Sequence, residues 1–250
     1  LPQDRYDVVD LNLGCPVRKV TRRGAGAALG ADREMACRCA EALVDACDLP
    51  VTAKIRVQSM DDPAPTVRLA EGLADAGITA LVVHGRVMEN FYSGPVACSV
   101  IGEVRKALRI PVVANGGVFC RESARALRAA SGCKSIMVAR GAIGNPWIFR
   151  ELSDPEFVSP PHEETCAEIE EHVEGIVALY GEDVGMRNAR KIILAYLTGR
   201  GYRRRRRRGV TSISTFAEFR ELIAVLRDEG PSHHYDERER TSRGGALEVC

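Results

Sequence analysis

The chain has 250 residues, of which 45% are hydrophobic and 28% charged, with a formal net charge of +1. Such a composition is ordinary for a folded protein of one large domain, with or without an appendage, and excludes a chain that is basic throughout. No signal peptide leads the sequence and no apolar run is long enough to span a bilayer, so we expect no membrane segment. Nine cysteines without zinc-site spacing indicate free thiols in a reducing cytoplasm, and no metal site.

Five short apolar runs rich in valine and isoleucine do not alternate with polar residues, which is typical of parallel strands buried on both faces. These predicted strands cover residues 6–11, 51–55, 80–83, 110–114 and 135–138. Amphipathic helical patterns separate them, over 32–46, 64–76, 96–108 and 122–130. Alternating strands and helices predict an α/β fold with a parallel sheet.

Polar groups follow every predicted strand: Asn12 and Cys15, then Lys54 to Arg56, His84 to Arg86, Asn115 to Gly117, and Ala139 to Gly141. An open, doubly wound sheet concentrates its site at one switch point, whereas a (β/α)8 barrel builds its site from all the strand ends. The pattern therefore favours a TIM barrel with about five strands visible. The other three strands would precede Leu1, so we expect an amino-terminally truncated barrel.

The carboxyl-terminal part changes character after Leu152. A proline-containing linker comes first, and three helical patterns follow without an intervening strand, over 163–180, 184–197 and 214–227. We expect a partial barrel domain over 1–152, a small all-α helical domain over 153–228, and a disordered tail over 229–250.

Six consecutive arginines stand between the second and third of these helices: Arg203, Arg204, Arg205, Arg206, Arg207 and Arg208. Flexible arginines suit a sequence-independent grip on an RNA phosphate backbone. The alternative is a solvated charged loop, which many charge runs are. The helical domain around the run favours RNA contact.

The last two strand ends predict a phosphate site. Asn115, Gly116 and Gly117 let backbone amides approach an anion, and Arg140, after Ala139, adds a fixed cation. The alternative is a pair of tight turns without a ligand, but two such motifs on adjacent strands favour a phosphorylated cofactor.

The other strand ends indicate chemistry on that cofactor. Lys54 is costly to bury unless it meets an anion, such as the pyrimidine edge of a reduced flavin. His84 suits the same cofactor, and its place at a strand end favours that role over the alternative, a core histidine. Cys15 could act as a nucleophile, a metal ligand or a proton donor, and beside a flavin proton donation is the simplest role.

These residues resemble the tRNA-dihydrouridine synthases. The resemblance lies in DLNLGCPVRKV…GAGAAL, VTAKIRV, VVHGR, FYSGP, PVVANGG and MVARGAIGNPWIF, in family order over about the first 150 residues. The segment MRNARKIILAYLTG resembles the helical tRNA-binding domain of that family more loosely. The family's opening Pro-Met strand and the two strands after it are absent, and Asn-Gly-Gly stands where Asn-Gly-Asp is common.

The resemblance implies an FMN enzyme that reduces the C5–C6 double bond of uridine in tRNA, with NADPH recharging the flavin. It implies that Cys15 is the catalytic acid, that Asn12 addresses the uracil, and that Arg86 lies at the rim and contacts substrate. It also implies a cofactor-binding set, namely Lys54, His84, Asn115, Gly116, Gly117, Ala139 and Arg140.

Two other functions remain open. One is an FMN barrel acting on a free pyrimidine, in the manner of a dihydroorotate dehydrogenase. The other is an inactive, truncated barrel that only binds RNA through its arginines. We expect tRNA as the partner, no membrane or metal partner, and a monomer.

Overall fold

The computed structural model describes residues 3–232, and these residues form two compact units. The first comprises residues 3–118 and 122–139, and the second comprises 119–121 and 140–232. The units divide near residue 140, earlier than the boundary expected at 152. The predicted tail begins at Glu229, which still belongs to the last helix, and residues 233–250 lie outside the described part.

The first unit contains a five-stranded sheet in which neighbouring strands are parallel and follow one another in chain order. Its strands are β1 (Val9–Leu13), β2 (Val51–Arg56), β3 (Ala80–His84), β4 (Val112–Asn115) and β5 (Ser135–Met137). All five predicted strands are confirmed. The first is displaced, because Tyr6 and Val8 are exposed and the pairing with β2 begins at Val9.

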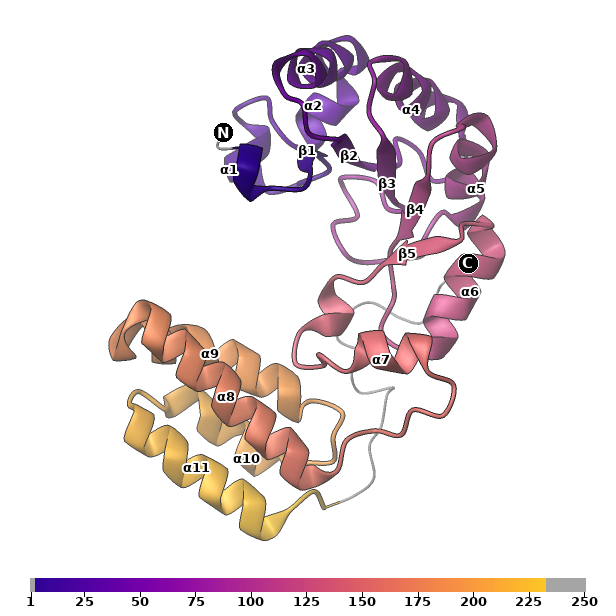
Figure 1. Ribbon diagram of the computed structural model, residues 1–250. Coiled ribbons are helices and arrows are strands. Elements are labelled where there is room, and N and C mark those ends of the chain that lie inside the picture. The colour runs from indigo at the N-terminus through magenta and orange to yellow at the C-terminus, as the bar shows by residue number, and fades with distance from the viewer. Residues whose placement is uncertain (1–2, 233–250) are drawn as a thin grey trace. The chain divides into compact units, whose positions relative to one another are not determined.

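Helices pack along one side of this sheet (Figure 1). They are α3 (Arg33–Ala46), α4 (Ala64–Asp75), α5 (Cys98–Ala107) and α6 (Arg121–Ser131), close to the predicted ranges. Asp32 starts α3 as expected, since its side chain accepts a hydrogen bond from the Met35 amide at 3.0 Å. Two short helices precede it, α1 (Arg18–Thr21) and α2 (Ala27–Ala31).

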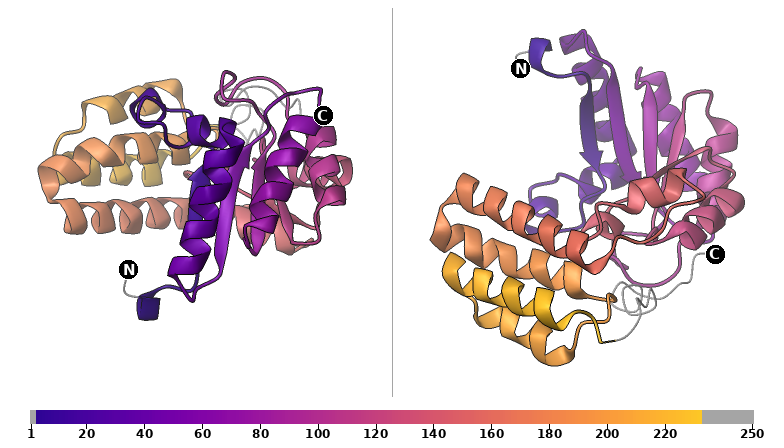
Figure 2. Two further views of the ribbon diagram at one scale, coloured as in Figure 1. Left: turned by 90° about the horizontal axis from the view of Figure 1, so that it is seen from above. Right: turned by 60° about the horizontal axis from the view of Figure 1, so that its bottom comes forward.

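The second unit is built from helices with a core of their own. They are α7 (Ile148–Ser153), α8 (His162–Tyr180), α9 (Glu182–Leu197), α10 (Arg204–Gly209) and α11 (Phe216–Glu229). Figure 2 shows α8, α9 and α11 side by side in this unit. Fully buried side chains such as Ile169, Ile193 and Phe219 fill the space between them. A capping box between Thr215 and Glu218 starts α11.

The arginine run is not the flexible loop that the sequence suggests. Five of the six arginines belong to α10, and Arg203 precedes it. The short 3₁₀ helix η3 (Val210–Ser212) follows and buries Val210 completely. Contacts from other helices therefore order a segment whose own charges oppose ordering.

Candidate active site on the open face of the sheet

Strand register places the predicted site residues on one face of the sheet. Asn12 of β1 pairs with Lys54 of β2. One step further along the same face, Arg56 of β2 pairs with His84 of β3, which pairs with Asn115 of β4. Since successive side chains alternate between the faces of a strand, the intervening residues point to the helices instead. Those are buried apolar residues: Leu13, Ile55, Val83 and Ala114.

Cys15 follows the end of β1 and is held there by a turn and by α2. The Asn12 Oδ1 accepts a hydrogen bond from the Gly14 amide at 3.1 Å. The Cys15 carbonyl accepts one from the Ala27 amide at 2.9 Å, which joins the cysteine to the start of α2. The first bond also fixes the Asn12 amide, so that its Nδ2 group is the one that can donate to a ligand.

Two glycines allow this close approach. A Cβ on Gly26 would lie 2.7 Å from the Cys15 carbonyl oxygen, and one on Gly30 would lie 2.5 Å from the Leu13 carbonyl oxygen. Gly26 also has a φ of +62°, which other residues rarely adopt. The GAGAALG segment is therefore a packing platform for the cysteine, a role that sequence reasoning did not assign to it.

Arg56 holds the loops around the site together. Its Nε donates to the Gly14 carbonyl at 2.8 Å, and one terminal nitrogen donates to the Phe91 carbonyl at 2.8 Å and to the Val87 carbonyl at 3.2 Å. The side chain is only 4% exposed, so its fixed fork of donors replaces the water these carbonyls would otherwise need. The sequence places Arg56 only at the end of a strand, and the structure shows that it bridges two loops.

Arg86 is also buried rather than at the rim, with 1% of its surface exposed. Its Nε donates to the Gly94 carbonyl at 2.9 Å and so holds the loop that follows β3. Within that loop Phe91 has a positive φ of +47° and is exposed, as is Tyr92. The rim position predicted for Arg86 is therefore wrong, while its assignment to substrate binding stays a prediction.

Lys54 is a half-buried cation on the open face. Burial lowers its pKa, the positive charge of Arg56 lowers it further, and Asp10 opposes the shift. Asp10 is engaged with the neighbouring strand, because its Oδ1 accepts a hydrogen bond from the Thr52 hydroxyl at 2.7 Å. This arrangement disfavours the charged form of Lys54, and an anion beside the ammonium group would favour that form.

His84 and Asn115 are both buried where β3 and β4 end, with 6% and 5% exposure. The Asn115 Nδ2 donates to the Met137 carbonyl of β5 at 3.0 Å, so this side chain holds the sheet edge. The next two residues, Gly116 and Gly117, have φ values of +139° and +68°. A Cβ on Gly116 would lie 3.0 Å from a methyl group of Val96, a tight contact, and the φ of Gly116 is one that side-chain-bearing residues rarely adopt.

The remaining predicted residues fall on either side of the unit boundary. Ala139 is exposed after β5, in the first unit. Arg140 opens η2 (Arg140–Ala142) in the second unit, where its guanidinium lies 5.4 Å from the Phe119 ring centroid. The arginines of residues 203–208 also lie in the second unit. The sheet therefore brings together Asn12, Lys54, His84 and Asn115, next to Cys15.

Several negative expectations concern the described residues. None of the helices within residues 3–232 has the length and apolar character needed to cross a bilayer. In the same part of the chain, no cluster of three or more His, Cys, Asp or Glu side chains could hold a metal ion. Seven cysteines are free thiols, Cys15 among them.

A parallel sheet with helices on one side, and reactive side chains at the carboxyl ends of its strands, defines a protein of the TIM-barrel class. Comparison with known families makes the assignment specific. The dihydrouridine synthase (Dus) family model matches residues 2–228, and the chain belongs to that family. The predicted family and fold class, a (β/α) barrel segment followed by a helical domain, are thereby confirmed.

Curated relatives support the same assignment. The chain is 39% identical over 192 residues to a probable tRNA-dihydrouridine synthase of Rhodobacter capsulatus, covering 74% of this chain and 59% of the relative. It is 36% identical over 198 residues to tRNA-dihydrouridine synthase B of Pseudomonas putida, covering 77% and 59%. A probable tRNA-dihydrouridine synthase of Mycobacterium tuberculosis is 37% identical over 230 residues, covering 88% and 59%. The chain thus spans about 59% of the length of these relatives.

Proposed function

We propose that this protein reduces the C5–C6 double bond of uridine in tRNA to give dihydrouridine, using FMN that is recharged by NADPH. The observation that carries the proposal is the position of Cys15, whose backbone carbonyl is held by the Ala27 amide and packs closely on Gly26 where β1 ends. It follows the fixed amide of Asn12, in a chain of the dihydrouridine synthase family. The names of the curated relatives support tRNA as the substrate.

The open face of the sheet fits an anionic flavin. Lys54 is a half-buried cation whose pKa is lowered, so a negative group beside it would relieve a cost that the protein otherwise bears. Gly116 and Gly117 adopt backbone angles that favour glycine, and a Cβ on Gly116 would crowd Val96, which suits direct contact of amides with a phosphate. The full set proposed to hold FMN is Lys54, His84, Asn115, Gly116, Gly117, Ala139 and Arg140.

Reduced FMN would supply the hydride for the reaction. Cys15 then donates the proton from its Sγ to one carbon of the double bond, while the other carbon receives the hydride, and the thiolate regains a proton from solvent. Asn12 presents its Nδ2 to a uracil carbonyl, because its Oδ1 is occupied by the Gly14 amide. Arg86 is proposed to support substrate binding through the loop that it holds at Gly94.

The helical domain, proposed over residues 153–228, supplies the tRNA contact. The six arginines at 203–208 carry positive charge in a chain whose net charge is only +1, so they are its most concentrated cationic feature. Phosphate contacts of this kind set affinity and orientation rather than base choice. A cytoplasmic, monomeric enzyme remains our prediction for the protein as a whole.

The proposal is tested by following the flavin and the RNA together. The chain is loaded with FMN, its absorbance spectrum is recorded, and the flavin is reduced with NADPH without oxygen. Unmodified tRNA should reoxidise the flavin and gain dihydrouridine, whereas orotate should do neither. Reoxidation by orotate would point to an enzyme of free pyrimidines, and tRNA binding without a flavin band would point to an RNA-binding barrel.

Replacing Cys15 by alanine isolates the proton step. The variant should keep its flavin and its tRNA affinity but lose dihydrouridine formation by at least about 100-fold, as expected for loss of a general acid. Cys39→Ala is the matched control, because Cys39 is a free, half-buried thiol on α3. Normal turnover by Cys15→Ala would remove this cysteine from the mechanism.

A further inference from the structure

The helix α10 is ordered despite its composition. Adjacent guanidinium groups repel one another, and like charges four residues apart weaken an isolated helix. Arg203 gives α10 no side-chain cap, and the Arg206 amide bonds only to the backbone carbonyl of Arg203. The order must therefore come from contacts with the rest of the helical unit.

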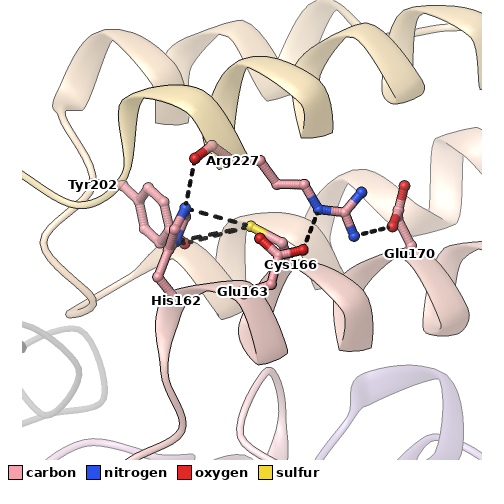
Figure 3. Close-up of polar contacts among 6 residues, drawn as sticks. All are labelled: His162, Glu163, Cys166, Glu170, Tyr202 and Arg227. Carbon is pink, nitrogen blue, oxygen red and sulfur yellow. Dashed lines mark hydrogen bonds and ion pairs between the residues drawn. The ribbon is translucent and has the colours of Figure 1, made fainter.

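The first contact is Tyr202, just before the run (Figure 3). Its hydroxyl lies 2.8 Å from Nδ1 of His162, while Nε2 of that histidine lies 3.3 Å from the Arg227 carbonyl. A carbonyl only accepts, so in the neutral imidazole Nε2 carries the proton and Tyr202 donates to Nδ1. The tyrosine ring is thereby fixed between α8 and α11, with Cys166 at 4.0 Å from its hydroxyl.

The second contact is Arg206, in the middle of the run. Its Nε donates to Oε2 of Glu229 at 2.7 Å, and a terminal nitrogen donates to Oε1, so the pair is bidentate. The Arg206 side chain is 25% exposed, whereas that of Arg205, 3.9 Å from the same carboxylate, is 75% exposed. Planar, two-point pairing of this kind fixes the arginine more firmly than a single contact does.

The third contact is Val210, which is fully buried in the core of the helical unit. Arg206 and Val210 are four residues apart in the helical segment, so they lie on one side of it, whereas Tyr202 anchors the chain before the helix begins. With 100° between successive residues of a helix, Arg204 and Arg208 lie about 160° from Arg206, on the opposite side, and Arg205 lies about 100° from it, on the flank. All three of these arginines are exposed.

We propose that Arg204, Arg205 and Arg208 form the surface that binds the RNA phosphate backbone, and that Arg206 is a positioning residue which holds this arginine face through Glu229. This inference rests on the proposed function, which treats the six arginines as one unit, and it gives Arg206 a different role from the exposed arginines. Because α10 is ordered before binding, less conformational entropy is lost when the phosphates arrive. Charge complementarity selects a polyanion as the occupant, and the polyanion is tRNA.

Salt titration separates contacting from positioning arginines. The slope of log affinity against log salt falls by about 0.7–0.9 for each phosphate contact that is lost. The triple variant Arg204→Gln, Arg205→Gln and Arg208→Gln should therefore lower the slope for tRNA by about two to three. Arg204→Gln alone should lower it by nearly one unit. Arg206→Gln removes the same charge but should change the slope by less than half as much.

A second readout reports the positioning role directly. In the protein without RNA, Arg206→Gln should speed hydrogen exchange at the amides of residues 206–210, and Arg204→Gln should not. The double exchange Arg206→Glu with Glu229→Arg keeps the net charge and can re-form the pair. It should restore slow exchange and most of the tRNA affinity that Arg206→Glu loses.

The outcomes separate this inference from the proposed function. If Arg206→Gln lowers the salt slope as much as Arg204→Gln, or if the triple variant keeps the full slope while still forming dihydrouridine, the arginine face is overturned and the function stands. If the unaltered protein binds tRNA without salt dependence, the phosphate surface is overturned. If it does not bind tRNA at all, the inference and the tRNA substrate are overturned together.

Discussion

Lys54 shows at the scale of one residue how a binding site can work against stability. Its pKa is lowered by burial and by Arg56, so the unfolded chain holds this proton more tightly than the folded chain does. Stability therefore rises with pH between the lowered folded pKa and the unfolded value of about 10.4. Below that window the protein keeps a charged lysine at a cost, which a bound anion would offset.

Replacing Lys54 by methionine should separate the two effects. At pH 7 the protein without cofactor should gain about 1 kcal/mol of unfolding free energy, the usual size of such a site-relieving change, and the gain should shrink at alkaline pH. FMN retention should fall at least tenfold. Urea unfolding measures the stability and flavin titration measures FMN retention. Replacement of the exposed Lys134 by methionine is the control. A loss of stability at pH 7 would show that Lys54 is a structural residue.

Arg56 is the residue at which a conservative change should fail. Arg56 uses two separate nitrogens for the carbonyls of Gly14 and of the loop after β3, whereas a lysine carries all its donors on one nitrogen and does not reproduce this spacing. Arg56→Lys should therefore cost about 3 kcal/mol and speed hydrogen exchange in residues 86–94. Arg33→Lys is the control, because exposed Arg33 makes one such bond, to the Arg68 carbonyl. Equal costs for both changes would refute the bridging role of Arg56.

At the scale of elements, the contact between α2 and the end of β1 decides where the cysteine lies. Gly26→Ala should lower the free energy of unfolding by about 1–2 kcal/mol because of the positive φ. It should lower it further because the added Cβ would clash with the Cys15 carbonyl. Gly24→Ala is a matched control, because Gly24 has a φ of +69° but no atom within 4 Å of an added Cβ. Residue-level thiol labelling of Cys15 should change only in the Gly26 variant. Equal stability losses and equal labelling would mean that α2 does not position the cysteine.

The sequence predicts these elements where the pattern is local. Buried apolar runs reveal all five strands, and their order along the sheet places Lys54 and His84 on neighbouring strands. The fork of Arg56 is not predictable in this way, because its acceptors are backbone carbonyls 31 to 42 residues distant. The helix α10 is missed for the same reason, since its order depends on Glu229, 23 residues further along the chain.

At the scale of the whole molecule, two separate cores support the two proposed activities. Ile55 is fully buried in the sheet unit, and Ile193 is fully buried in the cluster of the helical unit. The helical cluster draws its buried members from residues 166–226 alone. Segments that bury their own apolar surface can unfold as separate cooperative units. Ligands that bind only one unit should therefore stabilise only that unit.

This separation predicts two unfolding transitions. Ile55→Val should lower the unfolding free energy of the sheet unit by about 1 kcal/mol, and Ile193→Val should lower that of the helical unit by a similar amount. Because each change removes one buried methylene from one core, the other unit should keep its stability. FMN should raise most the transition that Ile55→Val lowers, because all its proposed contacts except Arg140 lie in that unit. The tRNA held at residues 203–208 should raise the transition that Ile193→Val lowers. Calorimetry with and without each ligand gives both midpoints. One transition that moves with both substitutions would show that the units fold as a single cooperative body, and that cofactor and RNA binding are coupled through it.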